Sequence, residues 1–189
     1  RFFDPLQYEA AVATVESALR LVSAAYTPLS LDFTAYRTPF SLLTIREIEA
    51  DARPERNPFH EYFRELCAHL AAERAGVVGL SVAFPGQVQP AYALAFMIRR
   101  FLPGVHVPVG GPAMTQILLR LRGEFLTRAL KPFNSAVLYE GEAALLELVR
   151  AADRGESPAG VIQGAKTTDL GELPAPDFDG LPLEQYLSP

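Results

Sequence analysis

The sequence is poor in the residues that form covalent and metal cross-links. It holds one cysteine, Cys67, and no tryptophan among its 189 residues. A single cysteine excludes an internal disulfide, and there is no cysteine cluster for zinc or an iron–sulfur centre. Cys67 lies in an apolar pattern of helical spacing, so it is predicted to be a small buried side chain. Low cysteine use also favours a cytoplasmic location.

Long apolar runs and basic runs are missing as well. Charged residues or prolines interrupt each apolar run before about 18 residues, the length that a membrane-spanning helix needs, so no membrane partner is expected. The formal net charge is −5 with acids and bases interspersed, which argues against a nucleic-acid partner. The chain opens with Arg1 rather than methionine, and we expect its natural start, with any signal peptide, to lie upstream.

What is present is a hydrophobic content of 49%, enough for one domain with a core, and a regular alternation of two periodicities. Helices are predicted over 4–25, 44–50, 57–76, 89–102 and 142–154, and one or two helices over 113–130. Strands are predicted over 29–33, 77–82, 105–109, 135–139 and 161–162. This alternation favours a doubly wound α/β fold, Rossmann-like or flavodoxin-like, with a mainly parallel sheet in three α/β/α layers.

The alternation also suggests where the domain begins and ends. No strand precedes the opening helix, so the usual first strand of such a fold is expected outside this sequence. Residues 1–164 form the predicted domain. Residues 165–189 are rich in Pro, Asp and Leu without a steady period, and we interpret them as a linker or docking tail.

Two loops follow predicted strands and outline a candidate site, because ligands bind at the carboxyl ends of parallel strands. The first loop contains Ser81, Val82, Phe84, Pro85 and Gln87. The Ser81 hydroxyl either binds a ligand or caps its own loop. Gln87 either donates to a ligand or faces water.

The second loop contains Gly110, Gly111 and Pro112. The two glycines either let the backbone approach a bulky ligand or make a tight turn. Neither GxGxxG nor a P-loop is present, so a dinucleotide or nucleoside triphosphate is not favoured at this loop.

A third group, Glu140, Gly141 and Glu142, follows the strand at 135–139 and opens a helix. The two carboxylates either complement the helix dipole or hydrogen-bond the amide groups of a ligand. Both stand at the start of one helix, so a glycosidase pair is not favoured. The three histidines stand in unrelated settings and are interpreted as structural, and no GxSxG nucleophile motif occurs.

These residues resemble a known family. Ser81-Val82-Ala83, followed after residues 84–109 by Gly110-Gly111, is similar to the SxL…GG pattern of cobalamin-binding domains, with Ala83 in place of the leucine. With Glu140-Gly141-Glu142 and the stretch from Leu173 to Phe178, the chain looks like the N-terminal cobalamin (B12)-binding domain of radical SAM proteins. In that family the final stretch, here up to Pro189, leads into the radical SAM barrel.

The chain departs from the pattern at one point. Many B12 domains carry a DxHxxG motif whose histidine ligates cobalt from below, and this sequence has none. At the usual spacing Tyr36 stands where the histidine would be. The resemblance therefore implies cobalamin bound without a histidine ligand, with Tyr36 as a candidate cover for the lower face of cobalt.

The resemblance implies a role within a larger enzyme. The full-length protein would use a 4Fe–4S cluster and S-adenosylmethionine for methyl transfer or another radical modification, and this fragment alone would not be catalytic. Two alternatives stay open. One is a flavodoxin-like module for another small ligand, and the other is a degenerate scaffold domain whose pocket is filled by side chains such as Phe84 and Met114.

Overall fold

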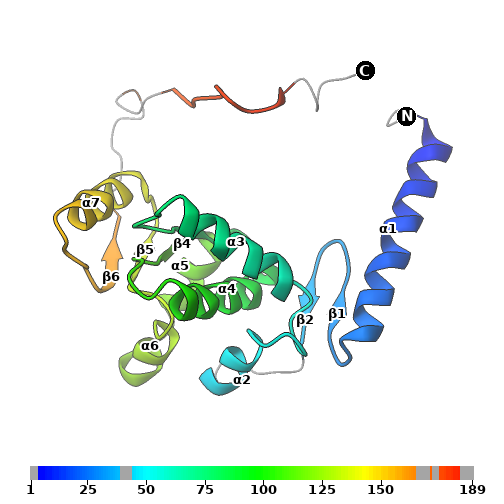
Figure 1. Ribbon diagram of the computed structural model, residues 1–189, viewed down its shortest axis with the longest axis horizontal. Coiled ribbons are helices and arrows are strands. Elements are labelled where there is room, and N and C mark those ends of the chain that lie inside the picture. Colours follow the sequence, from blue (N-terminus) through cyan, green and yellow to red (C-terminus); the bar gives the residue numbers. More distant parts are fainter. Residues whose placement is uncertain (1–3, 39–43, 165–170, 172–174, 184–189) are drawn as a thin grey trace.

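The computed structural model describes residues 4–38, 44–164, 171 and 175–183 (Figure 1). The helices are α1 (Pro5–Ala25), α2 (Ile45–Ala50), α3 (His60–Ala72), α4 (Val88–Phe101), α5 (Pro112–Leu118), α6 (Gly123–Ala129) and α7 (Glu142–Asp153). The strands are β1 (Ser30–Leu31), β2 (Tyr36–Arg37), β3 (Leu80–Ser81), β4 (Pro108–Gly110), β5 (Ser135–Leu138) and β6 (Gly160–Gln163). A short 3₁₀ helix, η1 (Pro85–Gln87), joins β3 to α4.

The predicted parallel sheet is confirmed. It has four strands in the order β3-β4-β5-β6, every pair is parallel, and each connection between neighbours contains a helix. The strand order follows the chain without reversal. Within the described part of the chain nothing pairs with the outer edge of β3, so β3 is an edge strand.

The core lies between one face of the sheet and the helices α3, α4 and α5. Successive strand residues point to opposite faces, so Val109 of β4, with Val107 just before that strand, shares a face with Ala136 and Leu138 of β5. These four pack with buried helix residues, among them Ile98 of α4 and Met114 of α5. Cys67 of α3 belongs to the same core and is 3% exposed, which confirms its predicted burial.

The opposite face is covered by α7, which completes three α/β/α layers. Val137 alternates with the core residues of β5 and therefore points to this second face. There the side chains of Leu145 and Pro108 both lie beside Gly79. Leu148 of α7 is fully buried. The chain thus has the predicted Rossmann-like α/β/α fold.

The helix α1 has the predicted bounds but takes no part in the core. Asp4 caps it by accepting hydrogen bonds from the backbone N–H groups of Leu6 and Gln7, and Pro5 occupies the first turn. No residue of α1 is buried, and the helix lies beside the body of the molecule next to the β1–β2 hairpin (Figure 1). Helical spacing of apolar residues predicts a helix but does not fix what covers it.

Two details differ from what the sequence pattern suggests. Residues 36–37 lie outside every predicted strand, but they form β2, which pairs antiparallel with β1. Phe101 belongs to the apolar helix α4, yet it is 45% exposed. On the same helix, Tyr92 is buried. Its hydroxyl donates to the carbonyl oxygen of Ala129 at 2.8 Å, and its ring packs edge-on against Phe133, so the polar tip of the side chain is satisfied inside the protein.

None of the described helices combines the length and the apolar character needed to cross a lipid bilayer. In the predicted linker, residues 175–183 are described and exposed, including Phe178 and Leu181. Leu173, Pro174 and residues 184–189 lie outside the described residues.

Candidate functional site

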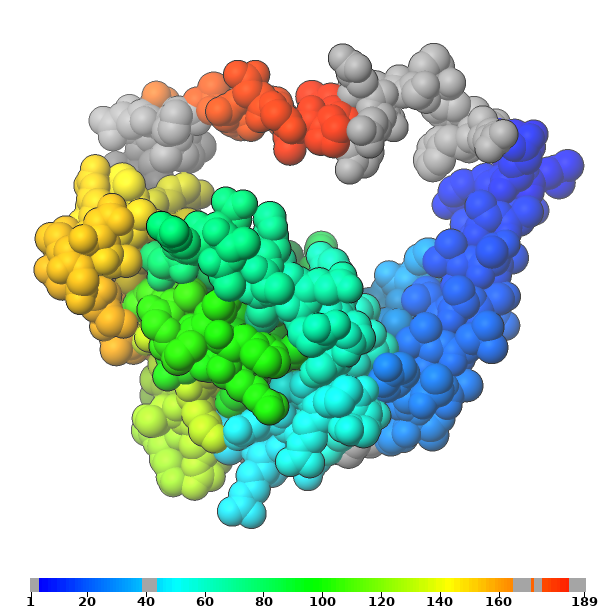
Figure 2. All heavy atoms as spheres, viewed as in Figure 1, coloured from blue at the N-terminus to red at the C-terminus, as the bar shows by residue number. Residues whose placement is uncertain are grey.

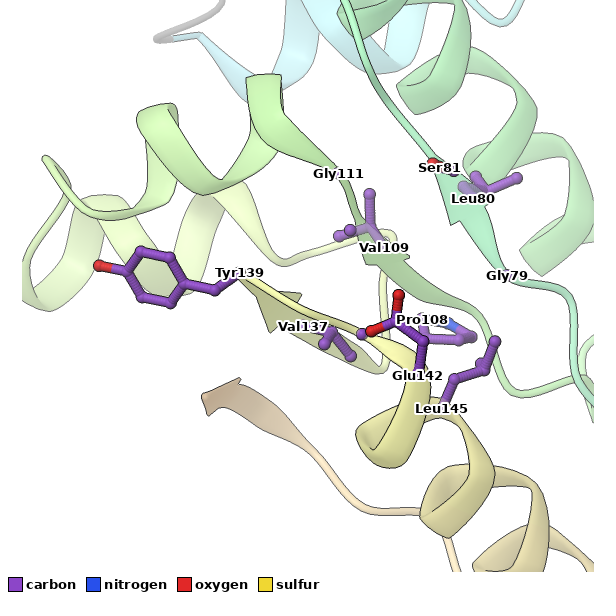
Figure 3. Close-up of a pocket in the computed structure, with 12 residues that line it drawn as sticks. Gly79, Leu80, Ser81, Pro108, Val109, Gly111, Val137, Tyr139, Glu142 and Leu145 are labelled. Atoms are coloured by element: carbon purple, nitrogen blue, oxygen red, sulfur yellow. The ribbon is translucent and has the colours of Figure 1, made fainter. Parts of the chain in front are cut away.

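A cavity of about 320 Å³ opens at the carboxyl ends of β3, β4 and β5, on the face that α7 partly covers (Figure 3). Its lining comes from three strands, the loops that follow them and the first turns of α7: Gly79, Leu80, Ser81, Pro108, Val109, Gly110, Gly111, Val137, Tyr139, Gly141, Glu142 and Leu145. The structure therefore brings together one predicted residue from the first loop, both glycines of the second and two residues of the third group.

Strand register explains why the first two loops meet. Ser81 pairs with Gly110 across β3 and β4, and neither belongs to the core face. Gly110 lies beside Val137 of β5, where a Cβ would approach the Val137 carbonyl oxygen to 3.3 Å. Gly79 lies two residues before Ser81 and faces the same side. This face of the strands, the floor of the cavity, therefore carries few side chains, and the cavity exists for that reason.

Ser81 is the polar residue on this floor. It is exposed, and its hydroxyl has no hydrogen-bond partner among the described residues. The alternative role for Ser81, capping its own loop, is taken by Gln87, whose Oε1 accepts from the backbone N–H groups of Ala83 at 2.9 Å and Phe84 at 3.1 Å. The serine hydroxyl is thus available to a ligand, while the carbonyl of the Gln87 amide is occupied by the loop.

The remaining residues of the first loop do not line the cavity. Val82 is buried in the core, whereas Phe84 and Pro85 are exposed. Phe84 is 68% exposed and borders a neighbouring hollow rather than filling the cavity. Met114, the other side chain expected to fill a degenerate pocket, is buried in the core on the opposite face of the sheet.

Gly111 has a structural requirement of its own. Its φ is +96°, and a Cβ there would lie 2.6 Å from the Val82 carbonyl oxygen. The close approach that this glycine permits is therefore between its own loop and β3. Pro112 follows as the first residue of α5 and is exposed.

The third group is divided by the start of α7. Gly141 and Glu142 line the cavity, and Figure 3 shows the Glu142 side chain reaching from α7 toward the strands. Glu142 stands in the first turn of the helix, where its charge also complements the dipole. Glu140 is exposed outside the cavity lining, and its carbonyl oxygen lies against Gly164 at the end of β6.

Tyr139 is a lining residue that the sequence analysis did not single out. It has a φ of +65°, and its backbone N–H donates to Thr115 Oγ1 at 3.2 Å. Its position directly after a predicted strand was the available signal, because the residue after a parallel strand reaches the ligand-binding edge. A tyrosine with positive φ is uncommon and often marks a functional loop.

Tyr36 does not line this cavity. It lies in β2 and borders the neighbouring hollow that Phe84 and Gln87 also line. The centroid of its ring is 5.9 Å from that of the Phe59 ring. Burial raises the pKa of the Tyr36 phenol to about 12, so the side chain is neutral across the physiological range. The structure therefore places Tyr36 beside the first loop but outside the cavity that holds Ser81.

The histidines stand apart from one another, as expected. His106 is buried, with Nδ1 at 3.0 Å from Ser157 Oγ and Nε2 at 3.1 Å from Ser135 Oγ, and burial lowers its pKa. His60 Nδ1 lies 3.1 Å from Glu61, and His69 is exposed. Across the described ranges no three His, Cys, Asp or Glu side chains gather as a metal site would require.

Comparisons with known proteins found no matching family model, no similar curated protein and no similar solved structure. The candidate site therefore stands on its residues and its geometry.

Proposed function

We propose that this chain is a cobalamin-binding domain that serves a radical SAM enzyme. The observation that carries the proposal is the convergence of Ser81, Gly110 and Gly141 on one cavity at the carboxyl edge of the parallel sheet. These residues come from the three sequence segments that resemble the B12-binding pattern. Ligands of open α/β sheets bind at this edge.

The residues of the cavity suit the chemistry of cobalamin. Cobalamin has a flat macrocycle rimmed with amide groups and a nucleotide tail that ends in a planar heterocycle. The tail fits a narrow slot with apolar walls, which Pro108, Val137 and Leu145 provide over a floor of glycines. The free Ser81 hydroxyl and the Glu142 carboxylate can hydrogen-bond polar edges of the ligand.

When bound, cobalamin supplies a cobalt centre that carries a methyl or other organic group. This chain would bind and orient the cofactor, and the reaction would occur where the rest of the enzyme meets it. A C-terminal radical SAM domain with its 4Fe–4S cluster and S-adenosylmethionine is part of the proposal, as is a cytoplasmic location.

Cobalt ligation by histidine is not part of the proposal. Among the described residues that line the cavity there is no histidine, and His106 is engaged by Ser135 and Ser157. Tyr36 could act only if a ligand extended from the cavity across the first loop. If the slot lined by Pro108, Val137 and Leu145 held the nucleotide tail, these residues would keep its base away from the metal, so we expect a base-off spectrum without a histidine ligand.

The first experiment is a spectral titration of the chain with hydroxocobalamin, followed by gel filtration to see whether colour elutes with the protein. The matched variants are Gly79→Val and Gly76→Val. A Cβ at Gly79 meets nothing closer than 4.0 Å and projects beside Pro108 and Leu145, so valine narrows the slot without straining the strand. A Cβ at Gly76 meets nothing within 4 Å, and Gly76 is outside the cavity.

The proposal predicts that the wild type and Gly76→Val retain cobalamin with a base-off spectrum and that Gly79→Val does not. Folded wild-type protein that retains no colour, or equal retention by both variants, would refute a cobalamin site in this cavity. A bound flavin or phosphate found in the purified protein would favour the flavodoxin-like alternative, and an empty, folded protein would favour the scaffold.

A further inference from the structure

A second cavity, of about 820 Å³, is formed by side chains that lie far apart in the sequence. It shares no residue with the cavity at the sheet edge. Its walls come from α2, the connection between α2 and α3, the C-terminal half of α4 and the segment before β5. Figure 2 shows the side of the molecule on which α2 (cyan), α4 (green) and the segment after α6 (yellow-green) meet.

The lining of this second cavity is strongly basic. Five cationic side chains border it, and its one acidic residue is Glu49: the cations are Arg46, Arg53, Arg99, Arg100 and Lys131. The chain as a whole has a net charge of −5. Concentrating five of its 17 lysines and arginines around one hollow creates a local positive potential, which attracts anions.

The arginines of the second cavity are not neutralised by the protein. Among the described residues, none of the four forms an ion pair. Several exposed arginines elsewhere do pair with carboxylates, as Arg64 does with Glu61 and Arg150 with Glu147. Arg99 donates to the neutral Oδ1 of Asn134 at 3.2 Å, which leaves its charge uncompensated. Lys131 is the paired cation of the cavity, with its Nζ 2.8 Å from Glu49 Oε2.

The second cavity also has an apolar side. Phe96, Met97 and Phe101 contribute to the lining, and the Lys131 ammonium lies 5.8 Å from the centre of the Phe96 ring. An aromatic face beside cationic groups can stack a planar ring while the cations hold attached phosphates. The cavity volume is within the range of about 300–1,000 Å³ that small-molecule sites occupy.

We propose that this second cavity binds a nucleoside polyphosphate. Planar guanidinium groups match phosphate oxygens with two parallel hydrogen bonds, which explains arginine in four of the five cationic positions. A single phosphate carries about −2 near neutral pH and would leave most of the cations unpaired, whereas a chain of phosphates reaches several of them. The proposal is independent of cobalamin, since the two cavities share no side chain.

Calorimetric titration of the full chain with ATP tests the proposal, with tripolyphosphate and adenosine as partial ligands. The test variants are Arg53→Gln and Arg99→Gln. The control is Arg120→Gln, which removes the same charge from an exposed arginine outside the cavity. All three side chains are exposed, and retained folding is checked by the unfolding temperature.

We expect ATP to bind more tightly than tripolyphosphate, and adenosine to bind far more weakly than either. Arg53→Gln and Arg99→Gln should each weaken ATP binding about tenfold, the loss expected for one charge-assisted hydrogen bond, while Arg120→Gln changes it less than about twofold. Bound ATP should also raise the unfolding temperature of the wild type.

Three results would overturn the proposal. They are no detectable binding of ATP at low ionic strength, an equal loss of affinity in the cavity variants and the Arg120→Gln control, or a single-stranded oligonucleotide that displaces ATP and binds more tightly. The last result would assign the basic surface to nucleic acid. Each of these results is read from ATP binding alone. The test of this proposal is therefore independent of the hydroxocobalamin titration.

Discussion

Two neighbouring glycines of one loop have different physical roles. Gly110 keeps the floor of the sheet-edge cavity free of a side chain, whereas Gly111 allows its loop to pass against the backbone of Val82. The loop after β3 shows the same difference in role. The Ser81 hydroxyl is free, whereas the side-chain carbonyl of Gln87 accepts hydrogen bonds from its own loop. Residue types in the sequence identified both loops. Only the contacts in the structure distinguish the residues that face the cavity from those that hold the loops in place.

Gly111→Ala should destabilise the protein by about 2 kcal/mol or more, because alanine disfavours a φ of +96° and its Cβ would clash with the Val82 backbone. Gly104→Ala is the matched control, since a Cβ there meets nothing within 4 Å. Urea unfolding of the two variants measures the difference. Equal unfolding midpoints would show that the loop relaxes without cost.

Ser81→Ala should weaken cobalamin binding about fivefold and leave the free energy of unfolding unchanged. The hydroxyl makes no hydrogen bond within the described structure, so its removal leaves no partner unsatisfied in the free protein. Absorbance titration gives the affinity and urea unfolding gives the stability. A marked loss of stability with unchanged affinity would instead assign Ser81 to the loop.

At the scale of elements, α7 is the helix that makes the fold three-layered. It places Leu148 beneath the second face of the sheet and delivers Glu142 and Leu145 to the cavity. Figure 3 shows Leu145 reaching toward Pro108. The helix that stabilises this face therefore also forms one wall of the candidate site.

Leu148→Ala should cost about 2–5 kcal/mol of unfolding free energy, because the leucine is 1% exposed and alanine would leave a void under α7. Leu146→Ala, in the same helix but at a residue that is 51% exposed, should cost less than about 0.5 kcal/mol. Chemical unfolding of both variants decides the matter. Similar losses would mean that α7 is not anchored through Leu148.

Local patterns predicted the elements well. Alternating strand and helix periods located β3 to β6 and α2 to α7 to within a few residues. Gly155, which has a φ of +74°, follows the end of the last helix. The hairpin strand β2 was missed, because residues 36–37 pair with β1 and their short segment has no period of its own. The placement of Tyr36 beside Phe59 rather than in the cavity is likewise a long-range contact.

At the scale of the whole molecule, the basic cavity is the feature that the sequence concealed. Its cations come from residues 46, 53, 99–100 and 131, and no window of the sequence contains a basic run. Net charge and the lack of a basic run argued against a nucleic-acid partner, but neither quantity shows a basic cavity that the fold assembles from separate segments. In contrast, the first site was predictable because parallel strands bring their carboxyl ends to one edge.

Global stability should fall as the pH drops below about 6.5, the ordinary pKa of histidine. Burial lowers the pKa of His106 in the folded state, so over this range the unfolded chain takes up a proton that the folded chain does not, and unfolding is favoured. The imidazole connects Ser135 of β5 with Ser157 of the loop before β6, so its protonation affects the sheet as a whole.

The measurement is the urea midpoint across this pH range for the wild type, His106→Gln and His69→Gln. His106→Gln should be less stable at neutral pH but should show a shallower decline on acidification. His69→Gln, which replaces an exposed histidine, should follow the slope of the wild type. Parallel curves for all three proteins would assign the acid sensitivity to other groups.

The close packing of Gly164 against the 138–140 segment has one more consequence. A Cβ at Gly164 would overlap the Glu140 carbonyl oxygen, and the Gly164 N–H donates to the Leu138 carbonyl oxygen at 2.9 Å, so the chain leaves the sheet against the loop that borders the sheet-edge cavity. Residues 175–183 are joined to that point by the same chain. Their effective concentration at the site is therefore set by the length of the connection and not by their abundance. A contact between that segment and a bound ligand could then form within the chain, even if the same segment as a separate peptide showed no measurable affinity for the ligand.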